Sequence, residues 1–414
     1  MSLKKVSSLF KNTQQEATIC KDVAVIAVIK DESAYIHEWV HHYQYFGFKK
    51  IYLAINRTTD KTIEVLDLIC SKYDNVEYFI TDWIDKDADK TGINPNMQRL
   101  SFSFLANEAF KDPSITHCLS VDADEFFYPT CFKKDIKQFV NSFDFASKLS
   151  IHWACQEVDE EEFSAPFVNK GYYVTPQVKT IITRCTYENM RKFTLHVPLL
   201  KSNYNASHID ASGDTFEKGK HRELAAPSFN INQNAYILHR MVRSECEYLA
   251  LLLRQNPEST SRVKKNRDGI TKKAKLSYLD VPESHLKSYH DSLDEFIKYC
   301  NLAGMLNKIR EDVKISALEI LDIADEELLK DVDTYYKVLK GTSIFSSFHK
   351  RIKSIDYLNI IDEPLINKFR DIAISFEGLD LNVSLELMRI ASRFRPGGNL
   401  IAHKVSQYEA QIIN

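Results

Sequence analysis

Three acidic residues follow a short apolar run in the segment HCLSVDADEFFY, residues 117–128. Asp122 and Asp124 are two residues apart, so on an extended chain their side chains point to the same side. Carboxylates this close repel each other unless a positive charge lies between them, and a divalent metal ion is the usual partner. With Glu125 they offer hard oxygen ligands, without Cys or His at zinc spacing, which favours Mn²⁺ or Mg²⁺. The pattern predicts metal-assisted departure of a phosphate group.

Asp-x-Asp is a short pattern, and solvated turns are also rich in Asp. The surroundings favour a functional site over such a turn. A strand is predicted from Ile115 to Val121, after a turn at Pro113, and the bulky apolar residues 126–128 follow the acids directly. A plain surface turn does not need this apolar surface behind it.

A buried sheet has to position these acids, and the N-terminal part of the sequence indicates one. The β-branched run at residues 23–29 is typical of a strand covered on both faces. Helices are predicted at 34–48 and 63–73, and further strands at 49–56 and 76–83. This alternation predicts a doubly wound α/β sheet, which binds ligands at the carboxyl ends of its strands. The polar residues at these ends are Lys30, Asp31, Asn56, Asp60 and Asp82.

Composition describes an ordinary globular protein of two domains. The chain has 414 residues, and single cores tend to split beyond roughly 250 to 300 residues. Its apolar fraction is 44% and its charged fraction is 27%. The formal net charge of -3 is no signature of a nucleic-acid-binding protein.

A cytoplasmic location is expected. The eight cysteines stand singly, which is typical of small buried side chains in a reducing compartment. The N-terminal residues lack the continuous apolar segment of a signal peptide. The apolar run at residues 23–29 is far shorter than the roughly 20 residues that cross a bilayer as a helix. Any membrane association is therefore expected to be peripheral.

Several segments, in order, resemble a known family. The segment KDESAYIHEWVHHYQYFGFKKIYLAINRTTDKT (30–62) is similar to the opening of family 2-type glycosyltransferases, particularly the branch akin to family 92. Residues 122–126 are similar to the D-x-D-E-F element of that branch. Residues 179–182 resemble its K-S-I-like strand, and residues 236–244 its H-Y…K-S-like segment. The resemblance extends over about residues 20 to 260.

The resemblance implies a GT-A fold that uses a nucleotide-sugar donor, most simply a UDP-sugar, with Mn²⁺ or Mg²⁺. At the position of an Asp-Asp pair in many family 2 enzymes, this chain has Ile55-Asn56, which leaves the base of the donor open. Asp60 could equally cap the following helix, and Arg99 could lie on the surface. The expected donor-binding residues are Lys30, Asp31, Glu32, Asn56, Asp60, Gln98, Arg99 and Asp122.

The metal ligands are expected to be Asp122 and Asp124. His239 is the candidate third ligand, because a neutral imidazole adds coordination without more negative charge. A hydrogen-bonded core histidine is the alternative for His239.

An inverting transfer needs a carboxylate that removes a proton from the acceptor hydroxyl. Glu157 and Asp159 lie nearest the end of the strand predicted at residues 148–154, although so acidic a segment is also typical of a solvated loop. Acceptor contacts are expected from Trp153, which could alternatively pack in the core. Lys179 is expected on the acceptor side as well. The resemblance places His196 there too, although a structural hydrogen bond is equally plausible for His196.

The remaining sequence has helical periodicity from about Leu286 to the end. The basic stretch at residues 262–275 could attract anionic lipid headgroups or a phosphorylated acceptor, although such clusters are usually solvated surfaces. The last helix pair weakly resembles a tetratricopeptide hairpin, but one unit does not establish an array. The predicted organisation is a tail at 1–20, a GT-A domain at 21–260 and a helical region at 261–414.

These observations predict a glycosyltransferase that moves a sugar to a glycan or glycolipid acceptor, with inversion implied by the resemblance alone. A sugar-phosphate nucleotidyltransferase is the second enzymatic interpretation, although the glycine-rich loop expected after the first strand is missing from KDESAY. An interaction scaffold without activity is the third.

Overall fold

The computed structural model describes residues 19–87, 94–132, 135–143, 146–168, 171–219, 225, 228–254, 263–271, 275–355, 357 and 361–413. The chain divides into two compact units, each treated by itself below. The first unit contains residues 1–157, 165–241 and 275–310, and the second contains 158–164, 242–274 and 311–414. The predicted tail lies almost entirely outside the described residues, and the predicted boundary at residues 260 and 261 lies wholly outside them.

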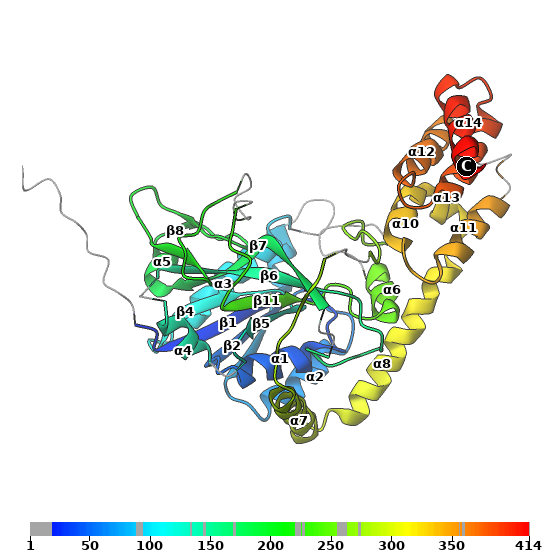
Figure 1. Ribbon diagram of the computed structural model, residues 1–414. Helices are drawn as coiled ribbons and strands as arrows, with labels where there is room; N and C mark the ends of the chain where they lie inside the picture. Colours follow the sequence, from blue (N-terminus) through cyan, green and yellow to red (C-terminus); the bar gives the residue numbers. More distant parts are fainter. Residues whose placement is uncertain are drawn as a thin grey trace, which may run out of the picture. The chain divides into compact units, whose positions relative to one another are not determined.

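The first half of the sheet follows the predicted alternation of strands and helices. Strands β1 (Asp22–Ile29), β2 (Lys50–Ile55) and β3 (Val76–Ile80) are parallel neighbours, and helices α1 (Ile36–Tyr45) and α2 (Thr62–Cys70) connect them (Figure 1). The expected strands and helices of this region are therefore confirmed. β1 is apolar on both faces because helices cover both.

One face of this half packs against α3 (Met97–Ala109). Alternate residues of β1 and β2, among them Ala24, Ile26 and Ala54, form a core cluster with Phe102 and Leu105 of α3. Alternation of side chains along a strand sends the intervening residues to the opposite face. α1 and α2 lie on that opposite side (Figure 1).

The second half of the sheet is mixed. β4 (Ile115–Ser120) is parallel to β1 but antiparallel to β7 (Gly171–Thr183), which is antiparallel to β6 (Lys148–Gln156). β11 (Ala235–His239) is parallel to β6, and β5 (Glu125–Pro129) closes the sheet antiparallel to β11. The strand order is β3-β2-β1-β4-β7-β6-β11-β5. The protein is thus an α/β protein whose central sheet is mixed and not parallel throughout.

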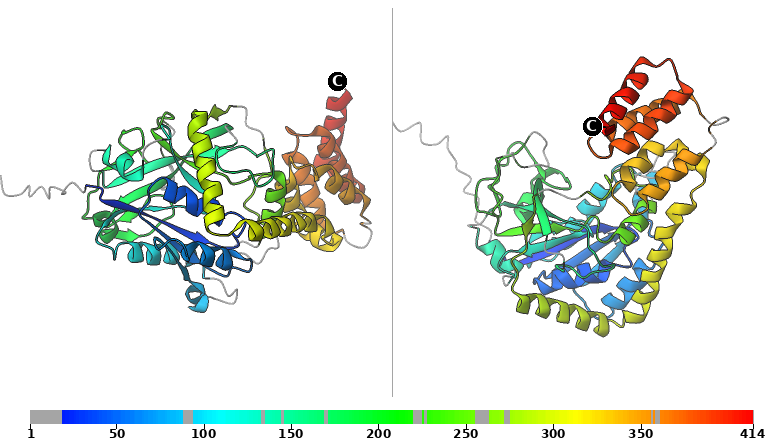
Figure 2. Two further views of the ribbon diagram at one scale, coloured as in Figure 1. Left: turned by 90° about the horizontal axis from the view of Figure 1, so that it is seen from below. Right: turned by 45° about the vertical axis from the view of Figure 1, so that its right-hand side comes forward.

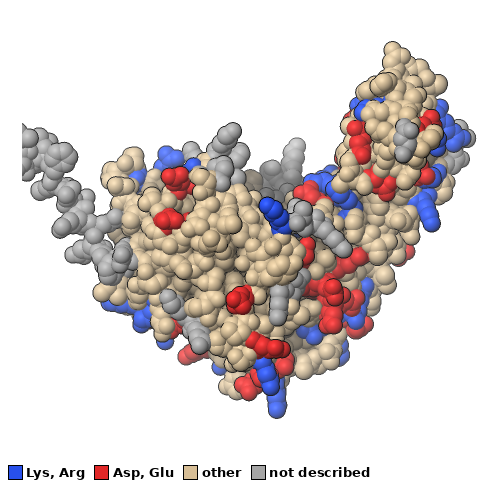
Figure 3. All heavy atoms as spheres, viewed as in Figure 1, with Lys and Arg blue, Asp and Glu red and all other residues tan. Residues whose placement is uncertain are grey.

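The first unit contains further short elements around this sheet. β10 (His208–Asp210) pairs with β6 and β12 (Ser277–Tyr278) with β7, while β8 (Met190–Lys192) and β9 (Leu199–Leu200) form a separate ribbon. α4 (Ile136–Asn141), α5 (Arg184–Glu188) and the 3-10 helix η1 (Asp82–Asp87) complete it. On the face in Figure 3, acidic and basic side chains are interspersed.

Helix α7 (Glu283–Tyr299) belongs to the first unit although it follows the sheet by many residues. Its Tyr289 is fully buried, and the Tyr289 hydroxyl lies 3.1 Å from Nδ1 of His42 on α1. His41 Nε2 lies 3.0 Å from the Ser292 hydroxyl. Figure 2 shows α7, in yellow-green, beside α1. Hydrogen bonds from Tyr289 and Ser292 to two imidazole groups of α1 hold this helix in place.

The second unit consists mainly of helices. α6 (Glu245–Leu253) begins with a capping box, in which Ser244 and Glu247 satisfy each other's backbone N–H groups. The division between the units falls within α8 (Ala303–Leu318). The C-terminal helices of the prediction are confirmed: η2 (Glu319–Asp322), α9 (Asp325–Lys330), α10 (Val332–Leu339), α11 (Phe345–Ser354), α12 (Glu363–Ser375), α13 (Leu381–Phe394) and α14 (Asn399–Ile413). Successive helices α12, α13 and α14 pack against each other.

Candidate functional site

The predicted acids lie where the strand order of the sheet reverses. From β1 the chain proceeds to β2 and β3 on one side, and β4 then pairs with the other edge of β1. Parallel strands on the two sides of such a point leave a crevice at their carboxyl ends, where α/β proteins bind ligands. Lys30 and Asp31 follow β1 at this edge, and Asp122 and Asp124 follow β4.

Asp122 is held by contacts from four elements. Its Oδ2 lies 2.8 Å from Lys179 Nζ, and its Oδ1 accepts a weak hydrogen bond of 3.4 Å from Gln98 at the start of α3. The Asp122 backbone N–H donates to Glu125 Oε2 at 2.7 Å, and the Trp39 indole donates to the Asp122 carbonyl at 3.1 Å. The side chain still keeps 33% of its surface exposed. A positioned, partly exposed carboxylate remains available to a ligand.

Glu125 and Lys179 form a buried ion pair beneath Asp122. Both side chains are fully buried, and Lys179 Nζ lies 3.0 Å from Glu125 Oε2. Burial raises the pKa of Glu125 to about 7, and the nearby Lys179 limits that rise. Burial disfavours the Lys179 ammonium, but Asp122 and Glu125 outweigh it and raise the pKa of Lys179. Lys179 therefore supplies the positive charge that the acidic cluster needs even without a metal ion.

The second predicted acid faces a histidine. Asp124 Oδ2 lies 3.4 Å from His239 Nε2, and the Asp124 carbonyl accepts a hydrogen bond from the Arg240 backbone. Burial alone lowers the pKa of His239, but the Asp124 carboxylate more than compensates and raises it to about 10. Without a metal ion, His239 is thus protonated beside Asp124.

Trp153, a predicted acceptor residue, lies next to both His239 and His196. The Trp153 ring is 4.3 Å from the His239 ring and 5.5 Å from the His196 ring, measured between centroids. His196 Nδ1 is 2.8 Å from the carbonyl of Val178 on β7, which fixes the ring. The structure therefore gathers Trp153, His196 and His239 in one cluster with Asp124.

Asp31 and Asp60, predicted to contact the donor, hold two loops together. Asp31 has a φ of 55°, and its Oδ1 accepts hydrogen bonds from the backbone of Thr59, at 2.7 Å, and of Asp60. Asp60 Oδ2 in turn accepts from the Ser33 backbone at 3.0 Å. Asp60 also accepts from the Thr62 backbone N–H, two residues on, just ahead of α2. These contacts show a loop-fixing role for both carboxylates, and their proposed contacts with the donor stay predictions.

Other predicted donor residues differ in their surroundings. Asn56 is 1% exposed, and its amide group donates to the Thr81 carbonyl and to Asp85. Arg99 bonds the Asn96 side chain at the start of its own helix. Asn56 thus contacts η1 and the residue before it, and Arg99 contacts the residue that precedes α3. The sequence pattern did not indicate these local contacts.

Lys30 and Glu32 flank Asp31 in the loop between β1 and α1. Lys30 Nζ is 3.9 Å from Asp31 Oδ2, and the backbone of Glu32 accepts hydrogen bonds from the first residues of α1. The Glu32 N–H donates to the Thr62 hydroxyl at 2.9 Å. Both residues therefore lie at the predicted edge of the sheet.

The two candidate bases fall in different compact units. Glu157 directly follows β6 in the first unit, and its backbone N–H donates to the Gly171 carbonyl. Asp159 belongs to the second unit, where its backbone N–H donates to the Arg243 carbonyl and it forms a bridge with Ser244. The role of either carboxylate as a base stays a prediction.

Within the described ranges, no three His, Cys, Asp or Glu side chains are already arranged as a metal site. Mg²⁺ is commonly held by only one or two carboxylates together with substrate phosphates, so a complete protein cage is not required. The Asp124 and His239 side chains approach each other to 3.4 Å, and Asp122 remains partly exposed nearby in sequence. Carboxylate oxygens of this kind suit Mg²⁺ and Mn²⁺, whereas an imidazole such as that of His239 is the more usual ligand of zinc, iron and other transition metals.

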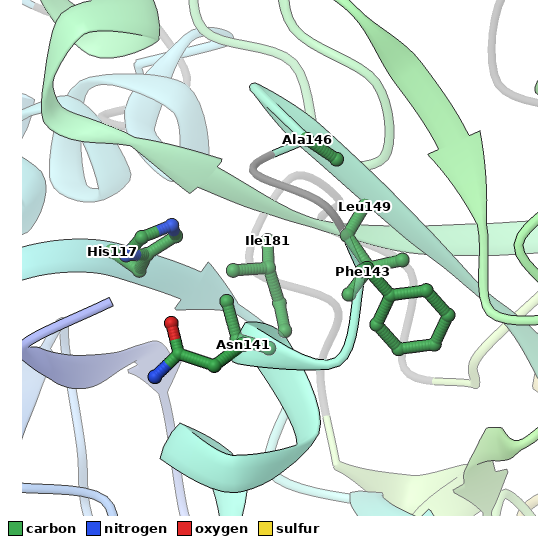
Figure 4. A pocket seen from close by; sticks show the side chains of 7 residues that line it. His117, Asn141, Phe143, Ala146, Leu149 and Ile181 are labelled. Atoms are coloured by element: carbon green, nitrogen blue, oxygen red, sulfur yellow. The ribbon is translucent and has the colours of Figure 1, made fainter. Parts of the chain in front are cut away.

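A small cavity elsewhere in the sheet offers no room for a nucleotide. Its volume is about 10 Å³, comparable to the space for one water molecule. Figure 4 shows the side chains around it, including His117 and Ile181 from the sheet and Asn141 from α4. The cavity is a packing feature beside α4. No helix among the described residues combines the length and the apolar character needed to cross a membrane.

Comparisons of the sequence and the structure with known proteins found one weak structural similarity to report. No family model matches the sequence, and no curated protein does. Among solved structures, HddC from Yersinia pseudotuberculosis is similar to 45% of this chain over 87% of its own chain, at 12% identity and a TM-score of 0.28. A similarity this low supports no argument about fold or activity.

Proposed function

We propose that this protein is a metal-dependent glycosyltransferase of the GT-A type, which transfers a sugar from a nucleotide-sugar donor to a glycan or glycolipid acceptor with inversion. One observation carries the proposal: Asp122 and Asp124 follow β4 at the reversal of strand order, and Asp124 faces His239. The sequence resemblance to family 2-type and family 92-type enzymes supports the same interpretation. A UDP-sugar is the donor that this resemblance favours.

The residues present suit a cation at this place. Asp124 and His239 would hold Mn²⁺ or Mg²⁺, with Asp122 as a further ligand. When bound, the metal ion would neutralise negative charge on the departing diphosphate. His239 would release its proton on metal binding, because a metal ligand has to be the neutral imidazole. Lys179 keeps Asp122 in position from below and lowers the repulsion within the acidic cluster.

The remaining residues divide between donor and acceptor. Gln98 contacts Asp122 and can reach the phosphates from the start of α3. Trp153 presents a partly exposed ring for a sugar, and His196 lies beside it. Glu157 is the base that we favour because it follows β6, the strand that carries Trp153.

The two alternative functions, a sugar-phosphate nucleotidyltransferase and an inactive scaffold, would need different features of the chain. A sugar-phosphate nucleotidyltransferase uses a glycine-rich phosphate loop after its first strand. Here β1 leads into Lys30-Asp31-Glu32-Ser33, without a glycine, and Asp31 closes that loop through its side chain. An inactive scaffold would have no use for a partly exposed carboxylate pair next to a buried lysine.

Donor binding is expected to depend on a divalent metal ion. Purified protein is melted with UDP-, GDP-, CMP- and TDP-sugars, each with Mn²⁺ and with EDTA. One nucleotide class should raise the melting temperature in Mn²⁺, because a ligand of the native state stabilises it, and the rise should disappear in EDTA. Pyrophosphate release from a nucleoside triphosphate and a sugar phosphate would instead identify a nucleotidyltransferase.

Asp124→Asn is expected to lower the rate of sugar transfer by at least about 100-fold, which corresponds to about 2.7 kcal/mol. The amide keeps the shape of the side chain but loses the charge that binds the cation. The metal-dependent melting shift should disappear, and the melting temperature without ligand should also fall, because the Asp124 carboxylate stabilises the protonated His239. Asp74→Asn, at an exposed position, is the matched control. Unchanged transfer and metal dependence in Asp124→Asn would remove the proposed metal site.

A further inference from the structure

A hollow of about 690 Å³ opens between α1, α7 and the turn before β3, all within the first compact unit. Trp39 of α1 donates to the Asp122 carbonyl, whereas His41, which lines the hollow, lies about 200° further round the same helix. The hollow is therefore on the side of α1 that faces away from the candidate site. Its volume is within the roughly 300 to 1,000 Å³ of ordinary small-molecule sites.

Aromatic rings form much of its wall. Tyr73 and Phe296 stack, with their centroids 5.2 Å apart and an angle of 17° between their planes. The Tyr299 ring meets Tyr73 edge-on at 5.7 Å and keeps 57% of its surface exposed. Tyr45, which is half-buried, lines the hollow from α1. Because these rings support one another, the wall is preorganised for a ligand with an apolar face.

Neutral hydrogen-bonding groups lie among the rings. The Gln44 amide of α1 donates to the Asn75 side chain at 3.1 Å, which leaves both amides further capacity to donate and accept. Among the described residues, the hydroxyls of Tyr45, Tyr73 and Tyr299 have no hydrogen-bond partner. The hollow therefore offers several donors and acceptors beside its apolar surface.

The charge of the hollow is low. Among the described residues, its lining has one carboxylate, Glu295 of α7, and no lysine or arginine. Lys72 lies outside the lining, with its Nζ 5.5 Å from the centre of the Tyr299 ring. His41 bonds the Ser292 hydroxyl and is neutral at pH 7, because burial lowers its pKa to about 4. A phosphate would meet no positive charge in this lining, so the hollow favours an uncharged ligand.

We propose that this hollow binds an uncharged oligosaccharide. A face of a pyranose ring presents C–H groups, whose partial positive charge suits the negative face of an aromatic ring. The hydroxyls of the same sugar donate to carboxylate and amide oxygens and accept from amide and phenol groups. Glu295 and Tyr299 are four residues apart on α7, so one helix face supplies both a carboxylate and a stacking ring. Binding here needs neither donor nor metal ion, so it does not rest on the proposed transfer activity.

The full chain is tested, in EDTA and without a nucleotide sugar, on immobilised uncharged oligosaccharides of glucose, galactose, mannose and N-acetylglucosamine. At least one of them is expected to bind, and its affinity is then measured in solution by calorimetry. Added sodium chloride should leave that affinity unchanged, because an uncharged ligand forms no ion pair that salt could screen. Binding of none of these compounds would overturn the proposal. That result would leave the metal-dependent binding of a nucleotide sugar unaffected, since neither partner is present in the test.

Variants of exposed residues on α7 locate the bound oligosaccharide. Tyr299→Ala should weaken binding about fivefold or more, because it removes the most exposed stacking ring. Glu295→Gln should weaken it about threefold or more, because a carboxylate accepts stronger hydrogen bonds than an amide does. Asp294→Asn, which changes the neighbouring exposed acid outside the lining, is the matched control and should bind as the wild type does. Wild-type affinity in Tyr299→Ala would show that the oligosaccharide binds elsewhere and would overturn the proposal.

Discussion

The free energy of unfolding is expected to fall by several kcal/mol when the pH is lowered from 7 to 5. Burial lowers the pKa of His41 and of His117 to about 4, well below the value of about 6.5 in an unfolded chain. The unfolded state therefore binds protons more readily than the native state below pH 6.5. At pH 5, which is about 1.5 pH units below the pKa of a histidine in the unfolded chain, each of these two histidines contributes about 2 kcal/mol less to the free energy of unfolding than at pH 7. This stability is fully present above pH 6.5 and is lost progressively down to pH 4.

Other groups modify the acid sensitivity in known directions. His42 is fully buried, and burial lowers its pKa well below the usual value, so it adds to the loss. Glu125 acts in the opposite direction, because its pKa is raised to about 7 and its protonation favours the native state. Over the same range that gain is about 2 kcal/mol, which is smaller than the combined loss from the histidines.

One variant isolates the contribution of His117 to the pH dependence of stability. His117→Asn can keep a hydrogen bond to Thr116 but cannot take up a proton. Urea unfolding at pH 7 and pH 5 should then show about 2 kcal/mol less dependence on pH than in the wild type. His403→Gln, which changes an exposed histidine, should keep the wild-type dependence. Identical pH dependence in His117→Asn and the wild type would show that His117 is not held neutral by burial.

Local patterns in the sequence were sufficient for the first half of the fold. The β-branched run of 23–29 became β1, Asp22–Ile29, because both of its faces are covered. The apolar spacing in 34–48 became α1, Ile36–Tyr45, with somewhat shorter ends. The mixed half of the sheet is different. Leu119 pairs with Ile181 far along the chain, and no local period of hydrophobic residues encodes which strand becomes the neighbour of β4.

The same distinction applies to the candidate site. Asp122 and Asp124 were recognisable because acids interrupt an apolar run, and the structure places Gln98 beside Asp122 and His239 beside Asp124. The ion pair of Lys179 with Glu125 was not recognisable, because it depends on the register between β4, β7 and β6. The polar residues that follow the strands lie at the predicted edge of the sheet, but the sequence did not indicate their hydrogen-bond partners.

Asp31 and Asn56 illustrate this last point. A carboxylate or an amide at the end of a strand can contact a ligand or a neighbouring loop, and both choices satisfy the same hydrogen-bonding groups. In this structure Asp31 bonds the loop of Thr59, and Asn56 bonds Thr81 and Asp85. Only the positions of the loops decide between these uses.

Lys179→Met is expected to lower the free energy of unfolding by about 3 to 5 kcal/mol, because it removes one partner of a buried ion pair. Methionine fills most of the volume, so the loss arises from charge and not from a cavity. Asp122 loses its contact at 2.8 Å, and Glu125 is left buried without its counter-charge. Urea unfolding at pH 8, where Glu125 is mostly ionised, measures the loss. Lys192→Met, at an exposed position, should change the stability by less than about 0.5 kcal/mol.

The double variant Lys179→Met with Glu125→Gln shows whether charge is the cause. Once Glu125 carries no charge, the loss of Lys179 should cost less, so the double variant should be more stable than Lys179→Met alone by about 1 to 3 kcal/mol. A double variant no more stable than Lys179→Met would indicate that packing of the lysine stem, and not its charge, stabilises this part of the sheet. Recovery would instead establish that Lys179 stabilises the acids electrostatically. The acidic motif after β4 would then depend on a lysine from β7 for its folding, before any metal ion binds.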